Sequence, residues 1–308
     1  MQNLSFSILI TTKNRKKDLA FTLDKILHLL DREDVNCVIF DDGSSDGTYE
    51  MVKENFPQVL LKRNFSSRGY LYCRNTMLND TQADYSISLD DDAHFLSEQV
   101  LENIEKHFIT NPKCALIACR IFWGLEPPFN TFSDEKIERT KGFVGCGHVW
   151  NMRAWKDIPN YPEWFVFYGE EEFAAFQLFK KDWEIHYLPE VLVHHRVDVK
   201  SRKKNKDYSL RLRRSLRSGW YLYILFYPVN QITKKFSYTL WIQIKNKVLK
   251  GDMKAAFAIL GAFGDVIYNL PKLIKNSNRL SKEEMSVFQN LNESKIYWSP
   301  QKSIYEKL

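Results

Sequence analysis

The sequence predicts an α/β fold with a mostly parallel, doubly wound central sheet, followed by a helical C-terminal region. Three observations support this prediction. Short apolar runs alternate with segments of helical periodicity in the first part of the chain. Two of these runs end in carboxylates, Asp41-Asp42 and Asp90-Asp91-Asp92. The chain has 308 residues, 44% hydrophobic and 14% aromatic, so it can bury a substantial core.

The first elements follow from these alternating patterns. Residues 5–11 (SFSILIT) form a short run rich in β-branched residues, which predicts a strand. Apolar residues in 15–30 recur at helical spacing, which predicts a helix. Strands separated by helices form parallel crossovers, so both acidic clusters should lie at the ligand-binding carboxyl edge of one sheet. The same patterns predict strands at 35–40, 59–62 and 85–89 and helices at 48–55 and 70–79.

After Asp92 the pattern is less regular. Residues 123–130 are a loop containing Pro and Gly, and the charged stretch 134–141 has no strong periodicity, so this region is a candidate mobile loop over the site. Residues 201–206 (SRKKNK) resemble a linker and suggest an α/β domain at 1–200 and a helical region at 201–308. We expect strands at 115–122, 142–150 and 185–195, and helices at 97–109, from about 170–172, and at 207–228, 229–250 and 252–275.

Charge divides the chain at the same boundary. Residues 201–308 carry 21 Lys and Arg against 7 Asp and Glu, whereas residues 1–200 carry 23 and 31. A basic, aromatic-rich region indicates anionic surroundings, either lipid headgroups or nucleic acid. The arginines of 208–227 alternate with leucines and aromatic residues, which favours peripheral membrane contact over a solvated helix. These arginines are Arg211, Arg213, Arg214 and Arg217.

The remaining composition predicts a cytoplasmic protein. The five cysteines are odd in number and include no Cys-x-x-Cys, so neither a disulfide framework nor a zinc site is expected. The N-terminal residues lack a signal-peptide pattern. The longest apolar stretches, near 219–229 and 255–264, are shorter than the roughly 20 residues of a spanning helix. We therefore expect a protein at the inner face of the membrane that does not span it.

The cluster Asp90-Asp91-Asp92 predicts a divalent metal site. Three like charges at the end of a buried strand are costly unless a cation lies beside them. Carboxylates in an Asp-x-Asp spacing suit Mg²⁺ or Mn²⁺, which usually keep open positions for phosphate ligands. A solvated acidic turn is the alternative. The second acidic strand end, Asp41-Asp42, favours the metal site.

Six motifs follow one another along the chain: TTKNR (11–15), DDGSSDGT (41–48), Arg68-Gly69 with Arg74-Asn75, LDDD (89–92), GEEEF (169–173) and PEVLVHH (189–195). In this order they make the chain resemble family 2 glycosyltransferases of the Rossmann-like GT-A fold. The resemblance covers roughly residues 4–196, and the helical tail is similar to that of bacterial rhamnosyltransferase-like members. It implies inverting transfer of a hexosyl or deoxyhexosyl group from a UDP-, dTDP- or GDP-linked donor to a glycan or lipid-linked acceptor.

The resemblance also implies roles for individual residues. Asp42 would accept a hydrogen bond from the donor base, and Arg68 would meet the diphosphate or the base. Asp92 and Asp90 would hold Mg²⁺ or Mn²⁺ together with a histidine, for which His194 is preferred to His195. The resemblance implies donor or substrate contacts for Thr11, Thr12, Arg15, Asp90, Asp91 and Glu170.

Inversion requires a base on the acceptor hydroxyl, and Glu171 falls at the position that the resemblance implies for it. The family usually has Glu-Asp there, so Glu170 and Glu172 stay open as the base or as caps of the following helix. Trp164, in an aromatic group with Phe165, Phe167 and Tyr168, is either a platform for a sugar or part of the core.

Two other classes of protein are alternatives. A nucleotidyltransferase would carry a Gly-rich phosphate loop after the first strand, and residues 11–17 contain no glycine. A catalytically inactive nucleotide-sugar-binding or scaffold protein is compatible with the unusual Glu170-Glu171-Glu172. A nucleic-acid binder is disfavoured by the acidic first domain.

Overall fold

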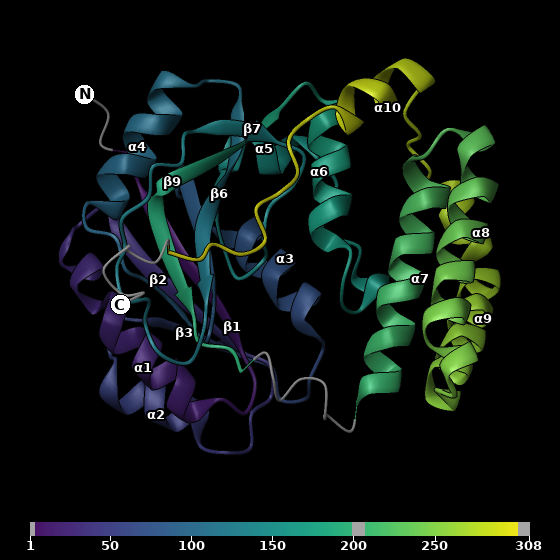
Figure 1. The fold of residues 1–308 in the computed structure, drawn as a ribbon. Helices are drawn as coiled ribbons and strands as arrows, with labels where there is room; N and C mark the ends of the chain where they lie inside the picture. Colours follow the sequence, from purple (N-terminus) through teal and green to yellow (C-terminus); the bar gives the residue numbers. More distant parts are fainter. Residues whose placement is uncertain (1–3, 199–206, 301–308) are drawn as a thin grey trace, which may run out of the picture.

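A computed structural model describes residues 4–198 and 207–300 and confirms the predicted α/β architecture (Figure 1). The described strands form one sheet in the order β3-β2-β1-β4-β8-β6-β9-β5, with β7 paired to β9. The strands are β1 Phe6–Thr12, β2 Val35–Asp41, β3 Leu60–Arg63, β4 Tyr85–Asp90, β5 Ala93–Phe95, β6 Cys114–Trp123, β7 Glu138–Thr140, β8 Gly147–Asn151 and β9 Glu184–His195.

The strand directions bring the predicted acidic clusters to one edge. β1 pairs in parallel with β2 and with β4, and the register sets Thr12 opposite Asp41 and Thr11 opposite Asp90. β8 runs antiparallel between β4 and β6, so β6 and the parallel β9 point the same way as β4. The carboxyl ends of β1, β2, β4 and β9 therefore lie together.

Helices cover both faces of the sheet, because side chains alternate between the two faces along each strand (Figure 1). On β1, Ile8 and Ile10 pack toward α1, α2 and α4, whereas Leu9 faces the core shared with α3, α5 and α6. The helices are α1 Lys16–Ile26, α2 Thr48–Asn55, α3 Tyr70–Asp80, α4 Val100–Thr110, α5 Met152–Asp157, α6 Glu170–Lys180, α7 Tyr208–Phe226, α8 Val229–Asn246, α9 Met253–Lys275 and α10 Lys282–Gln289.

The C-terminal helices share the core of the sheet's second face. Trp220, Tyr221 and Phe226 on α7 are buried, and the Phe226 ring stacks on Phe176 of α6 with centroids 4.8 Å apart. Helix α9 packs along α7, and α10 places Phe288 against Phe176. The predicted linker and boundary at 200–206 lie outside the described residues.

Three details differ from the sequence expectation. β8 begins only at Gly147, because residues 142–146 form turns and loop before it. The short β5, β7, α5 and α10 have too few residues to give a periodic signal. Helix α9 is long and apolar enough, by length and composition, to cross a membrane, contrary to the expectation. The uninterrupted apolar run stops before Asp265, but the helix continues through it.

Candidate functional site

The strand ends bring together two carboxylates and one imidazole that could hold a metal ion. Asp90 ends β4, Asp92 follows in the turn, and His195 ends β9. One ligand atom from each of them lies within 4.8 Å of the others. Nε2 of His195 is 3.0 Å from Oδ1 of Asp92 and 3.9 Å from Oδ2 of Asp90. Two carboxylates and an imidazole are suitable ligands for Mn²⁺, and Mg²⁺ could bind through the carboxylate oxygens.

The structure gives His195 the place that the sequence predicts for His194. Neighbouring residues of a strand point to opposite faces, so only one of the two rings can face the carboxylates. Nε2 of His194 instead lies 2.8 Å from the backbone oxygen of Gly124, and its ring packs against His94 and Phe122.

Two arginines neutralise the carboxylates. Buried Arg74 donates from Nη2 to Asp90 Oδ1 at 2.8 Å and to the backbone oxygen of Gly145 at 2.9 Å. Arg15, half exposed, places Nη2 2.5 Å from Asp92 Oδ2. Burial by itself raises the pKa of Asp92, but the His195 hydrogen bond and the Arg15 charge outweigh it and lower the pKa. Asp92 is therefore held as an anion.

Asp91 is turned toward β1 and α1. Its Oδ2 accepts a hydrogen bond from Oγ1 of Thr12 at 2.8 Å, and Oγ1 of Thr22 donates to its backbone oxygen at 2.8 Å. Burial raises the pKa of Asp91 to about 7, against the opposing charge of Arg15. Asp91 thus fixes the turn that carries Asp90 and Asp92.

Asp42 anchors the loop that follows β3. Its Oδ1 accepts from Asn64 Nδ2 at 2.7 Å and from the Arg68 backbone N–H at 2.8 Å. Its Oδ2 accepts from Ser67 Oγ at 2.6 Å and from the Gly69 N–H at 3.0 Å. Burial raises the pKa of Asp42, but these four bonds together lower it. A carboxylate has about four acceptor positions, so a ligand must exchange with one of these donors.

A cleft of about 480 Å³ opens at this edge of the sheet. This volume lies in the usual range of small-molecule sites. The buried hydroxyl oxygen of Thr11, at the end of β1, has no hydrogen-bond partner among the described residues. The residues that line the cleft come from strand ends, from the loop before α3, from the loop before α6 and from α7: Thr11, Thr12, Lys13, Asp42, Ser67, Gly69, Tyr70, Asp90, Asp91, Val166, Phe167 and Arg214.

Helix α6 begins with the three glutamates. Glu170 is buried, and one of its carboxylate oxygens has no partner among the described residues. Burial, more than any neighbouring charge, raises the pKa of Glu170 to about 7. Burial and the charges of Glu170 and Glu172 raise the pKa of Glu171 well above its usual value. These groups bind protons more tightly than ordinary glutamates.

Glu171 connects the metal-site carboxylates to a second cavity. A Cβ added at Gly145 would lie 2.5 Å from Glu171 Oε1, so the carboxylate rests directly on that glycine. The oxygen of Gly145 accepts from Arg74, which holds Asp90. On its other side Glu171 lines a cavity of about 390 Å³, and the remaining lining includes Glu172, Phe143, Phe176, Tyr223 and Tyr227.

The loop before α6 contains a strained turn. Val166 has φ 68° and ψ −49°, and the N–H of Phe167 donates to the oxygen of Phe165 at 2.8 Å. This is a γ-turn of the rare kind, costly for a β-branched residue. Nη2 of Arg217 on α7 donates to the same oxygen of Phe165. Helix α7 thus holds the loop that borders the cleft.

The side chains of Arg68 and Trp164, both predicted site residues, contact other protein side chains and do not line the cleft. The guanidinium of Arg68 stacks over Tyr72, 3.5 Å from the ring centroid, and donates to its hydroxyl at 2.6 Å. Trp164 packs between Phe165 and Tyr221, with centroids 4.8 and 5.3 Å away, which is the core alternative.

Several residues near the site carry no predicted site role. Tyr70, Lys13 and Arg214 line the cleft, and Gly145 supports Glu171. Lys13 lies inside the first motif, which offered a signal for it. Arg214 reaches the cleft from a helix far along the chain, so no local pattern could place it there.

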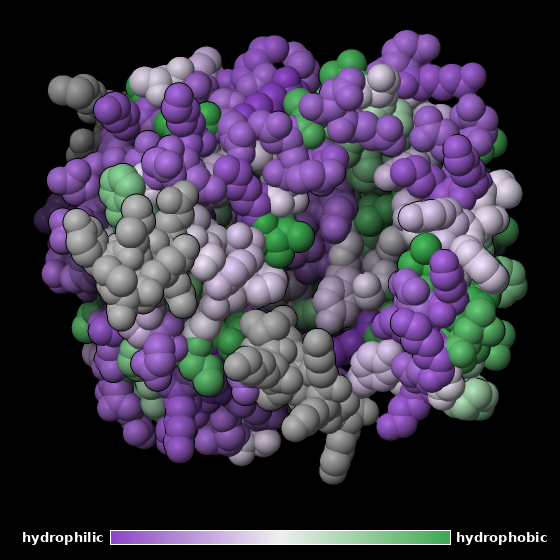
Figure 2. Space-filling view, in the orientation of Figure 1, coloured by the Kyte–Doolittle hydropathy of each residue, from purple (hydrophilic) through white to green (hydrophobic). Residues whose placement is uncertain are grey.

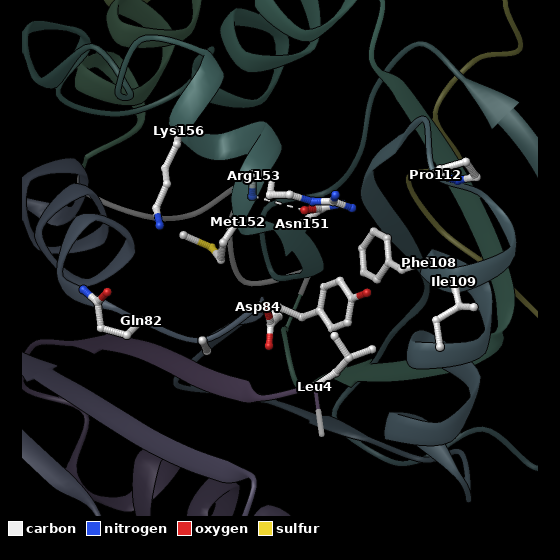
Figure 3. Close-up of a pocket in the computed structure, with 12 residues that line it drawn as sticks. Leu4, Gln82, Asp84, Phe108, Ile109, Pro112, Asn151, Met152, Arg153 and Lys156 are labelled. Carbon is white, nitrogen blue, oxygen red and sulfur yellow. Dashed lines mark hydrogen bonds between the residues drawn. The ribbon is translucent and has the colours of Figure 1, made fainter. Parts of the chain in front are cut away.

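A further cavity of about 480 Å³ lies at the amino end of β4 (Figure 3). Asp84, Tyr85, Phe108 and Arg153 line it, and Arg153 N donates to Asn151 Oδ1 at 3.1 Å. None of its lining residues belongs to the predicted site. The opposite end of β4 carries the acidic cluster, so this cavity is separate from the site.

Solved structures with low sequence identity share the fold. GalNAc-T7 with UDP, GalNAc and Mn²⁺ matches with a TM-score of 0.62 and 12% identity over 88% of this chain and 58% of its own. A mannosyltransferase from Pyrobaculum calidifontis, in complex with GDP-Man and Mn²⁺, matches with a TM-score of 0.52 and 15% identity over 92% and 78%. Residues 1–349 of S. aureus TarS match with a TM-score of 0.54 and 15% identity over 89% and 83%. The predicted GT-A fold is confirmed.

Sequence comparison identifies the family. A curated relative, the uncharacterized glycosyltransferase YfnE of Bacillus subtilis (strain 168), is 28% identical over 144 residues. These residues are 45% of this chain, and the chain spans 36% of that relative's length. The family model for glycosyl transferase family 2 matches residues 7–177, which is more than half of the chain and includes the ends of β1, β2 and β4, the acidic clusters and the start of α6. The chain therefore belongs to glycosyl transferase family 2.

Proposed function

We propose that the protein is an inverting, metal-dependent glycosyltransferase that moves a hexosyl or deoxyhexosyl group from a nucleotide-diphosphate sugar to a glycan or lipid-linked glycan during surface-polysaccharide synthesis. The observation that carries this proposal is the group Asp90, Asp92 and His195, since Asp90 also lines the cleft at the carboxyl edge of the sheet. The UDP, GDP-Man and Mn²⁺ of the structural neighbours support it. The rhamnosyltransferase-like subtype stays a prediction from the helical tail.

Asp92, Asp90 and His195 would hold Mg²⁺ or Mn²⁺, which would neutralise the negative charge of the departing diphosphate. Arg15 forms an ion pair with Asp92. When a metal ion binds Asp92 instead, the half-exposed Arg15 side chain can turn to the diphosphate. Lys13 and Arg214 add positive charge to the cleft walls. These side chains would orient the donor with its leaving group at the acidic edge.

Recognition of the nucleoside falls to β1, β2 and their loops. The hydroxyl of Thr11 can bond the donor without losing a partner. Asp42 can accept the imide N–H of a uracil or thymine ring by giving up Ser67, the donor whose hydroxyl rotates most easily. The Asn64 and backbone bonds would keep the carboxylate in place during that exchange.

Glu171 is the proposed base. An acceptor that enters the second cavity brings its hydroxyl to Glu171, which takes the proton as the oxygen bonds to the anomeric carbon. The bond from that carbon to the diphosphate oxygen breaks on the opposite face, so configuration inverts. A raised pKa makes the Glu171 carboxylate a stronger base than an ordinary glutamate. Glu170 is buried beside it, and Glu172 is exposed, so both remain alternatives to test.

The experiment is nucleotide release by the purified full chain from UDP-, dTDP- and GDP-sugars, with Mn²⁺, Mg²⁺ or EDTA. We expect one nucleotide class to be released in a metal-dependent manner, and Asp92→Asn and Glu171→Gln to abolish the release. The donors are also titrated by calorimetry. Binding without turnover of any donor, even with added glycan acceptors, would support the inactive binding protein instead. The absence of binding to the whole panel would overturn the donor cleft.

A further inference from the structure

Helix α9 has apolar residues on its inner side and on its outer side. Its inner face packs on α7 through buried Ala255, Ala258, Ile259, Ala262, Val266 and Leu273. Its outer face exposes large apolar side chains to solvent: Phe257, Leu260, Phe263, Ile267, Tyr268, Leu270 and Ile274. Leu260 is 68% exposed and Tyr268 is 86% exposed. A surface helix normally carries polar residues on its outer side, so this face is suited to an apolar partner.

The exposed face is long and free of charge in its middle. From Phe257 to Ile274 it extends about 26 Å at the helical rise. The acidic residue within this length, Asp265, is turned inward, where Arg213 donates to it at 2.5 and 2.8 Å. Figure 2 shows hydrophobic residues gathered along the edge of the molecule over α8 and α9.

Lysines stand at both ends of this face. Exposed Lys250 and Lys254 precede it, and exposed Lys275 follows it. Lysine side chains at such positions extend their charges toward a lipid headgroup layer while their stems cover apolar surface. The arrangement of apolar centre and basic ends is complementary to an anionic bilayer surface.

The neighbouring helix α8 carries a matching stripe. Lys234, Tyr238, Trp241 and Lys245 are exposed and recur at helical spacing on one side of α8. Phe236 of α8 contacts Phe263 of α9, with ring centroids 6.2 Å apart, so the two helices lie next to each other. Tyr and Trp beside Lys are typical of the interfacial layer of a membrane.

The contacts of α9 exclude an inserted, spanning arrangement. Asp265 is held by Arg213, and its backbone oxygen accepts from Tyr221 at 3.1 Å. Asn269 donates to the Tyr221 hydroxyl at 2.8 Å. A spanning helix would have to leave α7 and carry an unpaired Asp265 into lipid, which is costly. A second copy on this face would bring like-charged lysines together.

We propose that the outer faces of α8 and α9 form a docking surface for an anionic lipid bilayer, with α9 lying in the plane of the interface. The sequence expectation of membrane contact rests on the arginines of α7, but those side chains are used elsewhere. Arg211 pairs with Asp207, Arg213 and Arg217 pair with Asp265, and Arg214 lines the cleft. The docking surface does not depend on transferase activity, but together with the proposed function it points to an acceptor anchored in that bilayer.

The test is flotation of the full chain with vesicles of phosphatidylcholine alone or with 30% phosphatidylglycerol. We expect at least about tenfold stronger partitioning to the anionic vesicles, weakened by salt. The triple variant Phe257→Ser/Leu260→Ser/Ile267→Ser should lose about tenfold or more. Lys250→Gln/Lys254→Gln/Lys275→Gln should lose the preference for anionic lipid. The matched control Ile109→Ser/Val287→Ser changes exposed apolar residues on α4 and α10 and should float as the unchanged protein does.

Three results would overturn the proposal. Equal flotation of the serine variant and its control would show that the outer face of α9 does not contribute to membrane binding. A concentration-dependent dimer that only the serine variant abolishes would assign the face to a second copy. Retention in the membrane after alkaline carbonate extraction would make α9 a spanning helix. Circular dichroism and donor calorimetry on the same variants show that each is folded, and they test the donor cleft independently of the docking surface.

Discussion

The two acidic triplets of this protein differ in what surrounds them. Asp90-Asp91-Asp92 is contacted by two arginines and a histidine, namely Arg74, Arg15 and His195. Glu170-Glu171-Glu172 begins a helix, and no ion pair among the described residues involves it. Burial raises the pKa of Glu170 and Glu171, whereas the pKa of Asp92 is lowered despite burial. The pKa of Asp92 and the pKa of Glu171 are thus shifted in opposite directions, although both residues lie in runs of three carboxylates.

The difference suggests a division of labour. A carboxylate that is held ionised by cations suits a metal ion, which replaces one of those cations. A carboxylate that is buried beside like charges binds a proton readily, which suits a base. The four predictions below test this division, beginning with the largest expected effect.

Asp92→Asn should reduce nucleotide release about 1,000-fold, or about 4 kcal/mol of transition-state stabilisation, because the metal loses a charged ligand. Mn²⁺ binding, measured by electron paramagnetic resonance, should weaken in parallel. Asp80→Asn removes an exposed carboxylate that pairs with Lys62 and serves as the control. Unchanged Mn²⁺ affinity in Asp92→Asn would show that the aspartate cluster does not bind the metal.

Glu171→Gln should lower kcat about 100-fold or more and leave the donor KM almost unchanged, since the amide cannot take the acceptor proton. Steady-state kinetics with an acceptor measure both constants. Glu172→Gln changes the exposed neighbour and should keep most of the activity. If Glu170→Gln or Glu172→Gln alone gives the loss, the role of base moves to that residue.

Gly145→Ala should lower kcat about tenfold, because the new methyl group would displace the Glu171 carboxylate from its seat. The same kinetics give the result, and a crystal structure would show the shifted side chain. Gly264→Ala is the matched control, because a Cβ there meets nothing within 4 Å. Equal activity of both variants would mean that Glu171 tolerates displacement and does not act on the acceptor directly.

Glu172→Gln should shift the acid limb of the pH profile of kcat to lower pH, by about half a unit. The base must be deprotonated, so activity falls as the pH drops through the raised pKa of Glu171. Removing the Glu172 charge lowers that pKa, and the fall then occurs at lower pH. Glu190→Gln, which changes the exposed residue of β9, is the control. A shift to higher pH would contradict the proposed coupling.

The local part of this site was readable from the sequence, and its long-range part was not. Apolar alternation and acidic strand ends located β1, β2 and β4, and parallel pairing then forced Thr11 next to Asp90. The choice between His194 and His195 depends on the register of β9 against β6, which shifts at an irregularity after Cys119. No strand pattern shows such a shift.

The other misplaced residues have the same cause. Arg214 and Arg217 belong to a helix whose basic and apolar residues look like a membrane-binding pattern. Tertiary packing instead turns Arg214 into the cleft and pairs Arg217 with Asp265. Gly145 gave no signal either, because its importance comes from Glu171 lying against it in space.

The strained turn at Val166 limits how this enzyme can be recombined with its relatives. The backbone oxygen of Phe165 in this turn accepts a hydrogen bond from Arg217, which lies 52 positions later in the chain. A chimera that joins residues 1–200 to the tail of another family member would lose this bond unless the new tail supplies an equivalent arginine. The loop would then relax and change the shape of the cleft wall at Phe167. Acceptor or membrane specificity can therefore be exchanged only together with the α7 residues that support the donor cleft.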